Sequence, residues 1–252
     1  MYELDKFFSK KNTVDNITNQ DYLQTENYLD VVEAFARITY KSIYIIDYQK
    51  KSFEYVSDNP LFLCGLMPEQ VKELGYAFYF RNVIDKDLNL LFQINESGFD
   101  FYDKLPLDQR KLYTISYDFH IINEKGKEIL VNHKLTPIFL TSDGKIWKAM
   151  CIVALATNQT AGNITISKDN SDIIWKYNEE NGSWKSEKKI QLTERELEVL
   201  RLHAMGLTIN DIAGKLFLSI DTVKFHRRKL FEKIEVQNIT DALSYAVNNK
   251  LI

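Results

Sequence analysis

The stretch from Leu192 to Ile252 reads LTERELEVLRLHAMGLTINDIAGKLFLSIDTVKFHRRKLFEKIEVQNITDALSYAVNNKLI, and its capping residues divide it into four short helices. Thr193 and Glu196 have the spacing of a capping box, which predicts that the first helix begins at Thr193. Side-chain oxygens suited to an N-cap predict the starts of the other three helices, at Thr208, Ser219 and Thr240. This part of the chain is therefore predicted to be all helical.

The third of these predicted helices has two different faces. At about 100° per residue, Val223, Leu230 and Ile234 form one apolar stripe that should face a core. Residues 224–229 read KFHRRK and give the remaining surface four fixed positive charges. Two short helices joined by a tight turn, with the second one basic on its outer face, form a helix-turn-helix, whose second helix fits the major groove of DNA. A merely solvated charged face is disfavoured, because the charges lie on the helix that the motif assigns to the groove.

The whole of residues 192–252 resembles the LuxR-type, or GerE-type, DNA-binding domain. The matching pieces lie in register: LTERELEVL at 192–200, GLT at 206–208, DIA at 211–213, LS at 218–219, TVK at 222–224, HR at 226–227 and KI at 233–234. Two positions depart from the family. It usually has Asn where Lys229 stands, and a small residue, often Gly, where Glu235 stands.

The resemblance implies roles in DNA binding for two groups of residues on this domain. Base edges would be read by Lys224, Phe225 and Arg228. Phosphates would be contacted by Thr208, Asn210, Thr222, His226 and Lys229. Helix geometry independently places Phe225 and Arg228 opposite the apolar stripe, whereas His226 could equally be a packing residue. Because one short reading helix gives limited affinity, a homodimer on paired half-sites is expected, with the helix at 21–38 or the last helix, near Ala242, Tyr245 and Ala246, as its contact surface.

The composition of the whole chain excludes several classes of protein. The net charge of the chain is −3. From Gln191 onward there are nine Lys/Arg and eight Asp/Glu, so this part has a charge of +1 and the rest has −4. Because neither total is strongly positive, the local basic patch must attract DNA. Only two cysteines occur, Cys64 and Cys151, without a Cys-x-x-Cys motif, which argues against a disulfide framework or structural zinc. The first residues contain no apolar signal region, and no apolar run is long enough to span a membrane. The sequence therefore predicts a cytoplasmic protein without a membrane segment.

The remaining sequence predicts an α+β fold ahead of the helical domain. Two strand-like runs at 42–57 precede several short helices, and three long alternating runs between 113 and 157 follow. This order resembles a PAS domain over about residues 38–157, on the pieces YVSDN at 55–59, LCGLMPEQ at 63–70 and VIDKDL at 83–88. The fold class is a five-stranded, PAS-like antiparallel sheet with helices, followed by a separate four-helix helix-turn-helix domain. The predicted boundaries are an N-terminal segment with an amphipathic helix at 1–37, the PAS-like domain at 38–157, a connector hairpin at 158–190 and the helix-turn-helix domain at 191–252.

No catalytic or metal-binding constellation with suitable spacing is found. Residues 75–112 contain no histidine for haem, and Cys64 lies outside an Asn-Cys-Arg flavin motif, so the protein is predicted to carry no haem, flavin or metal. The resemblances imply a transcriptional regulator whose PAS-like domain senses a small-molecule ligand or a partner protein. Two rivals stay open: a regulatory module that acts through protein–protein contacts without DNA, and an enzyme acting in the first domain.

Overall fold

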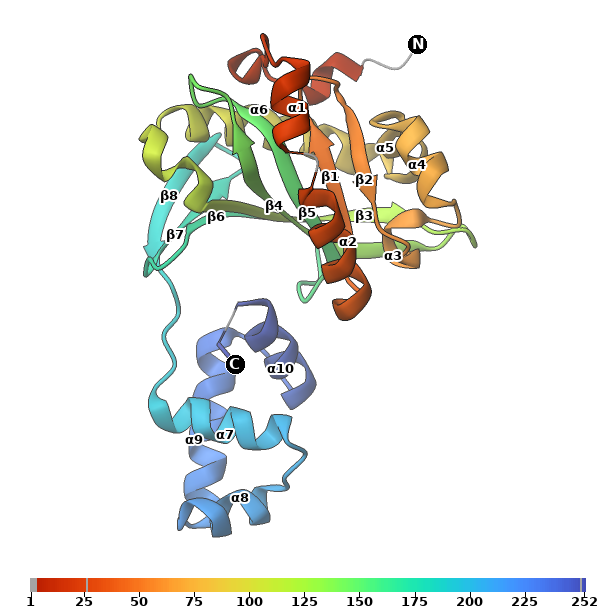
Figure 1. Ribbon diagram of the computed structural model, residues 1–252. Coiled ribbons are helices and arrows are strands. Elements are labelled where there is room, and N and C mark those ends of the chain that lie inside the picture. The colour runs from red at the N-terminus through yellow and green to blue at the C-terminus, as the bar shows by residue number, and fades with distance from the viewer. Residues whose placement is uncertain (1–3, 26, 250) are drawn as a thin grey trace. The chain divides into compact units, whose positions relative to one another are not determined.

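The computed structural model describes residues 4–25, 27–249 and 251–252 of the chain (Figure 1). These residues form two compact units: one runs to Glu187 and the other from Lys188 to Ile252. Across the described residues, no helix combines the length and the apolar character needed to cross a bilayer.

An eight-stranded sheet is the centre of the first unit. Its strands are β1 (Ser42–Asp47), β2 (Ser52–Val56), β3 (Tyr113–Ile122), β4 (Glu128–Leu140), β5 (Ile146–Leu155), β6 (Gly162–Lys168), β7 (Ile173–Asn178) and β8 (Ser183–Lys188). They lie in the order β2-β1-β5-β4-β3-β6-β7-β8. The pairings from β2 through to β7 are antiparallel. The strand pair, the helices and the three-stranded meander that the sequence patterns predicted are therefore present.

The sheet has eight strands: the five predicted for the PAS-like domain, β6, and the two strands β7 and β8, which the sequence predicted as a separate connector hairpin. Residues 162–188, read from the sequence as part of a connector, form β6, β7 and β8 and extend the sheet beyond β3. Pairing explains the difference, because Ile166 of β6 lies opposite Ile115 of β3 and both strands continue one ladder. A further bond across this edge comes from Asp118 of β3, whose carboxylate accepts from the Asn163 side chain of β6 at 3.0 Å.

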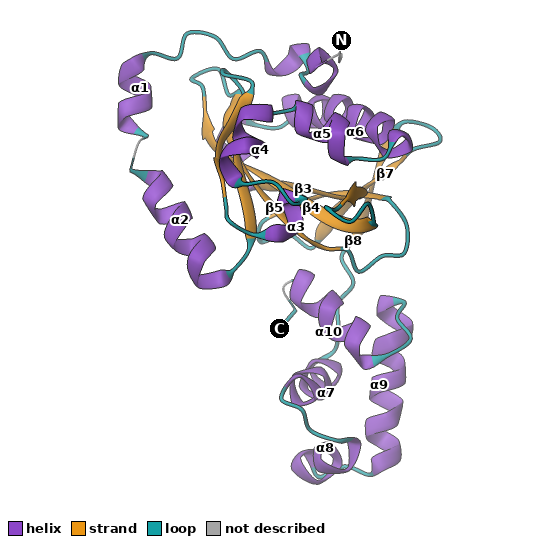
Figure 2. Ribbon diagram, turned by 90° about the vertical axis from the view of Figure 1, so that its right-hand side faces the viewer, coloured by secondary structure: helices purple, strands orange, loops and turns teal. Residues whose placement is uncertain are grey.

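Helices cover both faces of this sheet (Figure 2). On one face lie α3 (Pro60–Leu63), α4 (Pro68–Leu74), α5 (Ala77–Asn82) and α6 (Asp85–Asp103), followed by the 3₁₀ helix η3 (Leu107–Leu112). Strand β1 shows why two layers form, because every one of its residues is buried. Side chains alternate across a strand, so Tyr44 and Ile46 enter the main core while Ile43 and Ile45 enter a smaller core on the opposite face.

The N-terminal region packs on both of these cores. The short 3₁₀ helices η1 (Leu4–Phe7) and η2 (Lys10–Asn12) lead into the chain, and Phe7 is buried in the main core. The single amphipathic helix predicted at 21–38 is instead two helices, α1 (Asn19–Gln24) and α2 (Tyr28–Thr39). A capping box between Thr18 and Asp21 starts α1 earlier than the apolar periodicity indicated.

Four helices make up the second unit: α7 (Glu194–Ala204), α8 (Ile209–Leu216), α9 (Ile220–Ile234) and α10 (Ile239–Asn248). The predicted caps Thr193, Thr208 and Ser219 are confirmed, since each accepts a backbone N–H of its first turn. The predicted cap Thr240 is wrong. Asn238 caps α10, because its side-chain oxygen accepts the Asp241 N–H at 2.9 Å and Thr240 already lies in the first turn.

Candidate nucleic-acid interface

The buried apolar residues of α9 determine which side of this helix is exposed. Val223 and Leu230 are fully buried and Ile234 is almost so, as the apolar stripe predicted. Val223 packs in one small core with α7 and α8, while Leu230 and Ile234 pack in a second core with α7 and α10. The helix is thereby held by two separate apolar contacts along its length, and its outer face is defined by what remains.

The three residues proposed to read bases all lie on the exposed side of α9. Phe225 is 46% exposed, which is unusual for an aromatic residue that has a core nearby. The guanidinium of Arg228 lies 5.8 Å from the Phe225 ring centroid, so these two side chains form one stacked surface. Lys224 is exposed beside them and its ammonium lies 3.7 Å from Asp221.

The cations of this face are paired only with exposed carboxylates. Lys229 Nζ lies 2.7 Å from Glu232 Oε2 and Arg228 Nε lies 3.8 Å from Glu232 Oε1. A side-chain hydrogen bond from Lys229 holds the pKa of Glu232 below its usual value. Exposed pairs of this kind contribute little free energy, so phosphates can replace Glu232 as the partner of these cations.

The residues proposed to contact phosphate lie around the two helix starts and along α9. Thr208 caps α8 and its hydroxyl lies 2.6 Å from Asp211 Oδ2, while Asn210 is exposed in the first turn of α8. Thr222 is half-buried, with its hydroxyl 2.8 Å from the Ser219 hydroxyl. His226 is also half-buried and its ring lies 5.6 Å from that of Phe225. These residues are brought to the same part of the unit, but their roles toward DNA stay predictions.

One exposed aromatic residue at the turn between α8 and α9 was not singled out from the sequence. Phe217 is 95% exposed and ends α8 with a left-handed backbone, φ +55°. Its position directly after the last apolar residue of α8, in a turn of a helix-turn-helix, is the only sequence signal for it.

An ion pair between the exposed Lys233 of α9 and the buried Glu196 of α7 joins these two helices. Lys233 Nζ lies 2.7 Å from Glu196 Oε2, and the same carboxylate accepts the Thr193 N–H at 2.8 Å. Burial raises the pKa of Glu196, but the bonds from Lys233 and Thr193 outweigh it and the net pKa is lowered. The guanidinium of Arg227, which is half-buried, lies 5.8 Å from the Phe231 ring centroid.

The residues proposed for dimerisation on α10 are mostly inside their own unit. Ala242 and Ala246 are 0% exposed and pack in the core shared with α9, while Tyr245 is half-buried. The apolar spacing that suggested a contact surface is explained by this core. Other residues of α10 are exposed, namely Thr240, Asp241, Ser244 and Val247. A dimer contact through this helix stays a prediction, and it now has to involve these residues.

Within the described part of the chain, no group of three His, Cys, Asp or Glu side chains is arranged to hold a metal ion. Cys64 and Cys151 are both buried as free thiols, and burial raises the pKa of each.

The geometry of the second unit agrees with the sequence comparison. Residues 190–246 match the family described as bacterial regulatory proteins, luxR family. The second unit is thus a LuxR-type helix-turn-helix domain. The uncharacterised transcriptional regulatory protein YxjL of Bacillus subtilis is 45% identical over 60 residues, which are 24% of this chain and 28% of that protein.

Two longer matches extend beyond the length of the second unit. The oxygen regulatory protein NreC of Staphylococcus haemolyticus is 27% identical over 136 residues, which are 54% of this chain and 58% of NreC. A VqmA dimer structure from Vibrio cholerae, described for its conformation without target DNA, is 16% identical, with 88% of this chain and 87% of that chain covered and a TM-score of 0.34. The chain therefore spans little more than half of NreC and about a quarter of YxjL.

Proposed function

We propose that this protein is a transcriptional regulator that binds duplex DNA sequence-specifically through its second unit, under the control of its PAS-like first unit. The observation that carries the proposal is the exposed face of α9, where cations and Phe225 surround a helix whose inner side is fixed by two cores. This is the chemistry required in a major groove: Arg and Lys donate to guanine edges, and an apolar ring contacts the thymine methyl group.

The exposure of these side chains supports the residue roles that the family resemblance implies. Lys224, Phe225 and Arg228 are proposed to contact base edges, because they share the outer face of α9. Phosphate contacts are proposed for Thr208, Asn210, Thr222, His226 and Lys229. Such contacts fix the orientation of the domain on the duplex but carry no sequence information. The protein would act in the cytoplasm, where the DNA of a bacterium lies.

A homodimer is proposed as the DNA-bound form. Helix-turn-helix proteins bind two half-sites about one helical turn apart, and the two-fold symmetry of the site mirrors that of the protein. Two surfaces are candidates for the contact. One is the exposed side of α10, and the other is the outer face of α2, where Val31, Phe35 and Ile38 recur at helical spacing and Ile38 is 85% exposed.

The test is a selection of duplexes from a random pool by the full-length protein, followed by titration of the enriched duplex at several salt concentrations. We expect an enriched, two-fold symmetric sequence and an affinity that falls steeply with salt, because released counterions drive binding. Lys224→Ala should weaken binding, whereas Arg195→Ala should not. Arg195 is a matched exposed cation on α7, paired with Glu198 at 2.8 Å. No enrichment from the pool would instead favour a module that acts by protein–protein contacts.

A further inference from the structure

Strand β8 is the last strand of the sheet, and its outer edge is open. The strand order ends with β3-β6-β7-β8, so among the described residues β8 is paired on its β7 side alone (Figure 1). Most of its side chains are exposed, at positions 183, 185, 186 and 188. An edge strand presents unpaired backbone N–H and C=O groups, which can pair with another strand. The strand at the opposite end of the sheet, β2, is instead contacted by α4.

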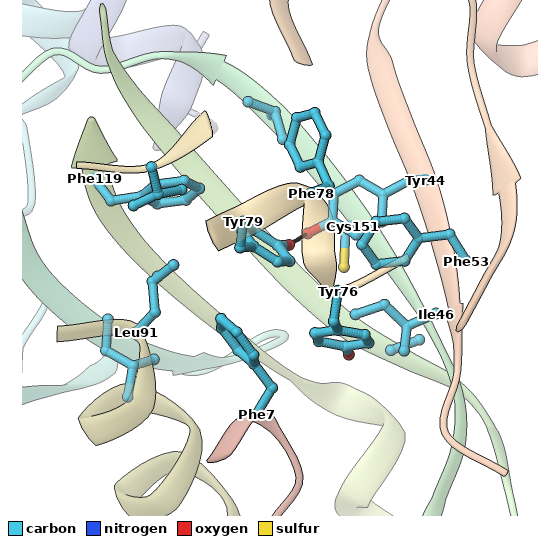
Figure 3. Packing of buried hydrophobic residues seen from close by; sticks show 14 of the residues in the cluster. Phe7, Tyr44, Ile46, Phe53, Tyr76, Phe78, Tyr79, Leu91, Phe119 and Cys151 are labelled. Carbon is cyan, nitrogen blue, oxygen red and sulfur yellow. Dashed lines mark hydrogen bonds between the residues drawn. The ribbon is translucent and has the colours of Figure 1, made fainter. Parts of the chain in front are cut away.

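The inner face of the hairpin formed by β7 and β8 is held by the main core. This core is rich in aromatic side chains, with Tyr76 and Tyr79 among them (Figure 3). The aromatic packing continues to the hairpin, where the ring centroid of Phe101 on α6 lies 5.3 Å from that of Trp184 on β8. The Trp184 indole N–H also donates to the backbone oxygen of Ser97 on α6 at 3.3 Å. These contacts hold β8 in place and leave its outer edge for a partner.

Strand β8 carries two opposite charges two residues apart. Side chains alternate across a strand, so Lys185 and Glu187 share the face opposite to that of Trp184. One carboxylate oxygen of Glu187 lies 2.9 Å from Lys176 Nζ on β7, and the other lies 3.5 Å from Lys185 Nζ. The Lys185 side chain is 77% exposed, and exposed pairs of this kind contribute little free energy. Lys185 can therefore exchange this contact for one with another molecule.

The sequence of β8 is complementary to itself in one antiparallel register. When two copies pair about a two-fold axis at Ser186, Lys185 of each copy lies opposite Glu187 of the other, with their Cβ atoms roughly 4.5–5.5 Å apart. On the other face, Trp184 of each copy lies opposite Lys188 of the other, which allows a cation–π contact. An axis at Lys185 would place lysine against lysine, and an axis at Glu187 would place glutamate against glutamate. A lysine alone on an edge discourages pairing, but here the two charges favour pairing in one register.

We propose that two copies of the protein join through their β8 edges, in the antiparallel register centred on Ser186, so that the sheet continues from one copy into the other. The partner is a second copy, because the complementary charges lie on the same six-residue strand. A two-fold contact of this kind uses the same surface on both copies. It is a different surface from the exposed sides of α2 and α10.

The position of β8 gives this contact a consequence for DNA binding, which rests on the proposed function. The second unit begins at Lys188, at the end of β8. In the proposed register the two copies of Lys188 lie four residues apart along the strands, roughly 14 Å from each other. The contact therefore brings the starts of two second units together, as binding to paired half-sites requires.

The first test measures the dimer dissociation constant of the full-length protein without DNA, by sedimentation at several protein concentrations. Lys185→Glu and Glu187→Lys each place like charges opposite each other twice, so each variant alone should dimerise roughly tenfold more weakly than the wild type. An equal mixture of the two variants should recover the affinity as a mixed dimer, because every charge then faces its opposite. Lys176→Gln is the matched control, because it removes a charge pair inside the hairpin but lies on β7. It should leave the dissociation constant unchanged.

A cross-link tests the register without changing the charges. With diamide as oxidant, Ser186→Cys should form a disulfide-linked dimer, because position 186 of one copy lies opposite position 186 of the other, within the distance that a disulfide spans. Ser183→Cys is the control. Its two copies lie six residues apart along the strands, roughly 20 Å, and should not be cross-linked. Cys64 and Cys151 are buried, so the wild type should not be cross-linked either.

The proposal is overturned if the wild type is monomeric at every concentration, if both charge variants dimerise as tightly as the wild type, or if their mixture associates no better than either alone. It is also overturned if Ser186→Cys is cross-linked no faster than Ser183→Cys. Tryptophan emission checks that each charge variant keeps the hairpin folded, and if one does not, the cross-link decides. A monomeric wild type would leave the edge of β8 to a different protein. Loss of DNA binding by a protein that still dimerises through β8 concerns the proposed function alone.

Discussion

At the scale of single residues, two non-glycine residues of the second unit have a left-handed backbone, Phe217 at the end of α8 and Glu235 at the end of α9. Glu235 ends α9 with φ +57°, in the left-handed region, and the sequence resemblance flagged this same position because the family usually has a small residue there. A side chain in that region costs roughly 1–2 kcal/mol, and glycine avoids the cost. The departure from the family therefore leaves the turn into α10 in place but makes it less stable.

The substitution Glu235→Gly should accordingly stabilise the second unit by about 1 kcal/mol. Hydrogen exchange of the α9 and α10 amides in the full-length protein measures this. Gly206→Ala is the matched control of opposite sign, because Gly206 has φ +82° and an added Cβ there would meet no atom within 4 Å. It should destabilise the unit by a similar amount. Slower exchange in the Gly206 variant would show that backbone strain is not the cause.

His133 gives the first unit a defined dependence on pH. Burial lowers the pKa of His133 to about 3. This folded-state pKa lies below the unfolded value of about 6.5. The contribution of neutral His133 to the free energy of unfolding is therefore fully present above pH 6.5 and is lost as the pH falls toward 3. By linkage, the loss between pH 8 and pH 5 is about 2 kcal/mol.

His133→Gln, which keeps a hydrogen-bonding group toward Tyr44, should remove that part of the pH dependence. Urea unfolding of both proteins at pH 8 and pH 5, followed by tryptophan emission, measures the difference. All three tryptophans, Trp147, Trp175 and Trp184, lie in the first unit, so the signal reports that unit. Equal slopes in the two proteins would mean that His133 is protonated in the folded state.

At the scale of elements, one buried lysine contacts both the sheet and the two N-terminal helices, of which α2 also packs on the sheet through Val32 and Ala36. Lys148 of β5 is 1% exposed and its ammonium lies 2.8 Å from Glu54 on β2 and 3.3 Å from the Thr25 hydroxyl at the end of α1. The rings of Tyr22 in α1 and Tyr28 in α2 lie 4.8 and 5.1 Å from it, and the Tyr28 hydroxyl bonds to Glu54.

Lys148→Met should destabilise the first unit strongly, by about 3–5 kcal/mol, because it leaves the Glu54 carboxylate without its cation in a mostly buried site. Adding Glu54→Gln removes that carboxylate and should restore a large part of the loss. Urea unfolding of the wild-type protein, the two single variants and the double variant gives a double-mutant cycle for this ion pair. Losses that simply add would contradict the ion-pair account and leave only packing.

The elements also show how far the sequence could predict this protein. Caps are local, so Thr193, Thr208 and Ser219 could be identified from spacing alone. Strand β6 could not, because its place is set by pairing with β3, far away in the chain. Likewise, the periodicity that marked Ala242 and Ala246 as a surface is the same for a helix that packs inside its own unit. The exposed face of α9 was predictable because both its apolar stripe and its charges repeat at helical spacing.

At the scale of the whole molecule, the chain runs from β7 and β8 at the end of the first unit into the second unit, which carries the basic face of α9. The account therefore requires that the face of α9 reads sequence, and not only attracts negative charge.

The most direct measurement titrates wild-type protein, Arg228→Ala and Lys229→Ala against the selected duplex and a scrambled one at several salt concentrations. We predict that Arg228→Ala loses roughly 1–3 kcal/mol on the selected duplex and discriminates less between the two. Lys229→Ala should weaken binding to both duplexes alike and reduce the salt slope by about one. Unchanged affinity of both variants for both duplexes would contradict the account and leave the basic face of α9 as a solvated surface.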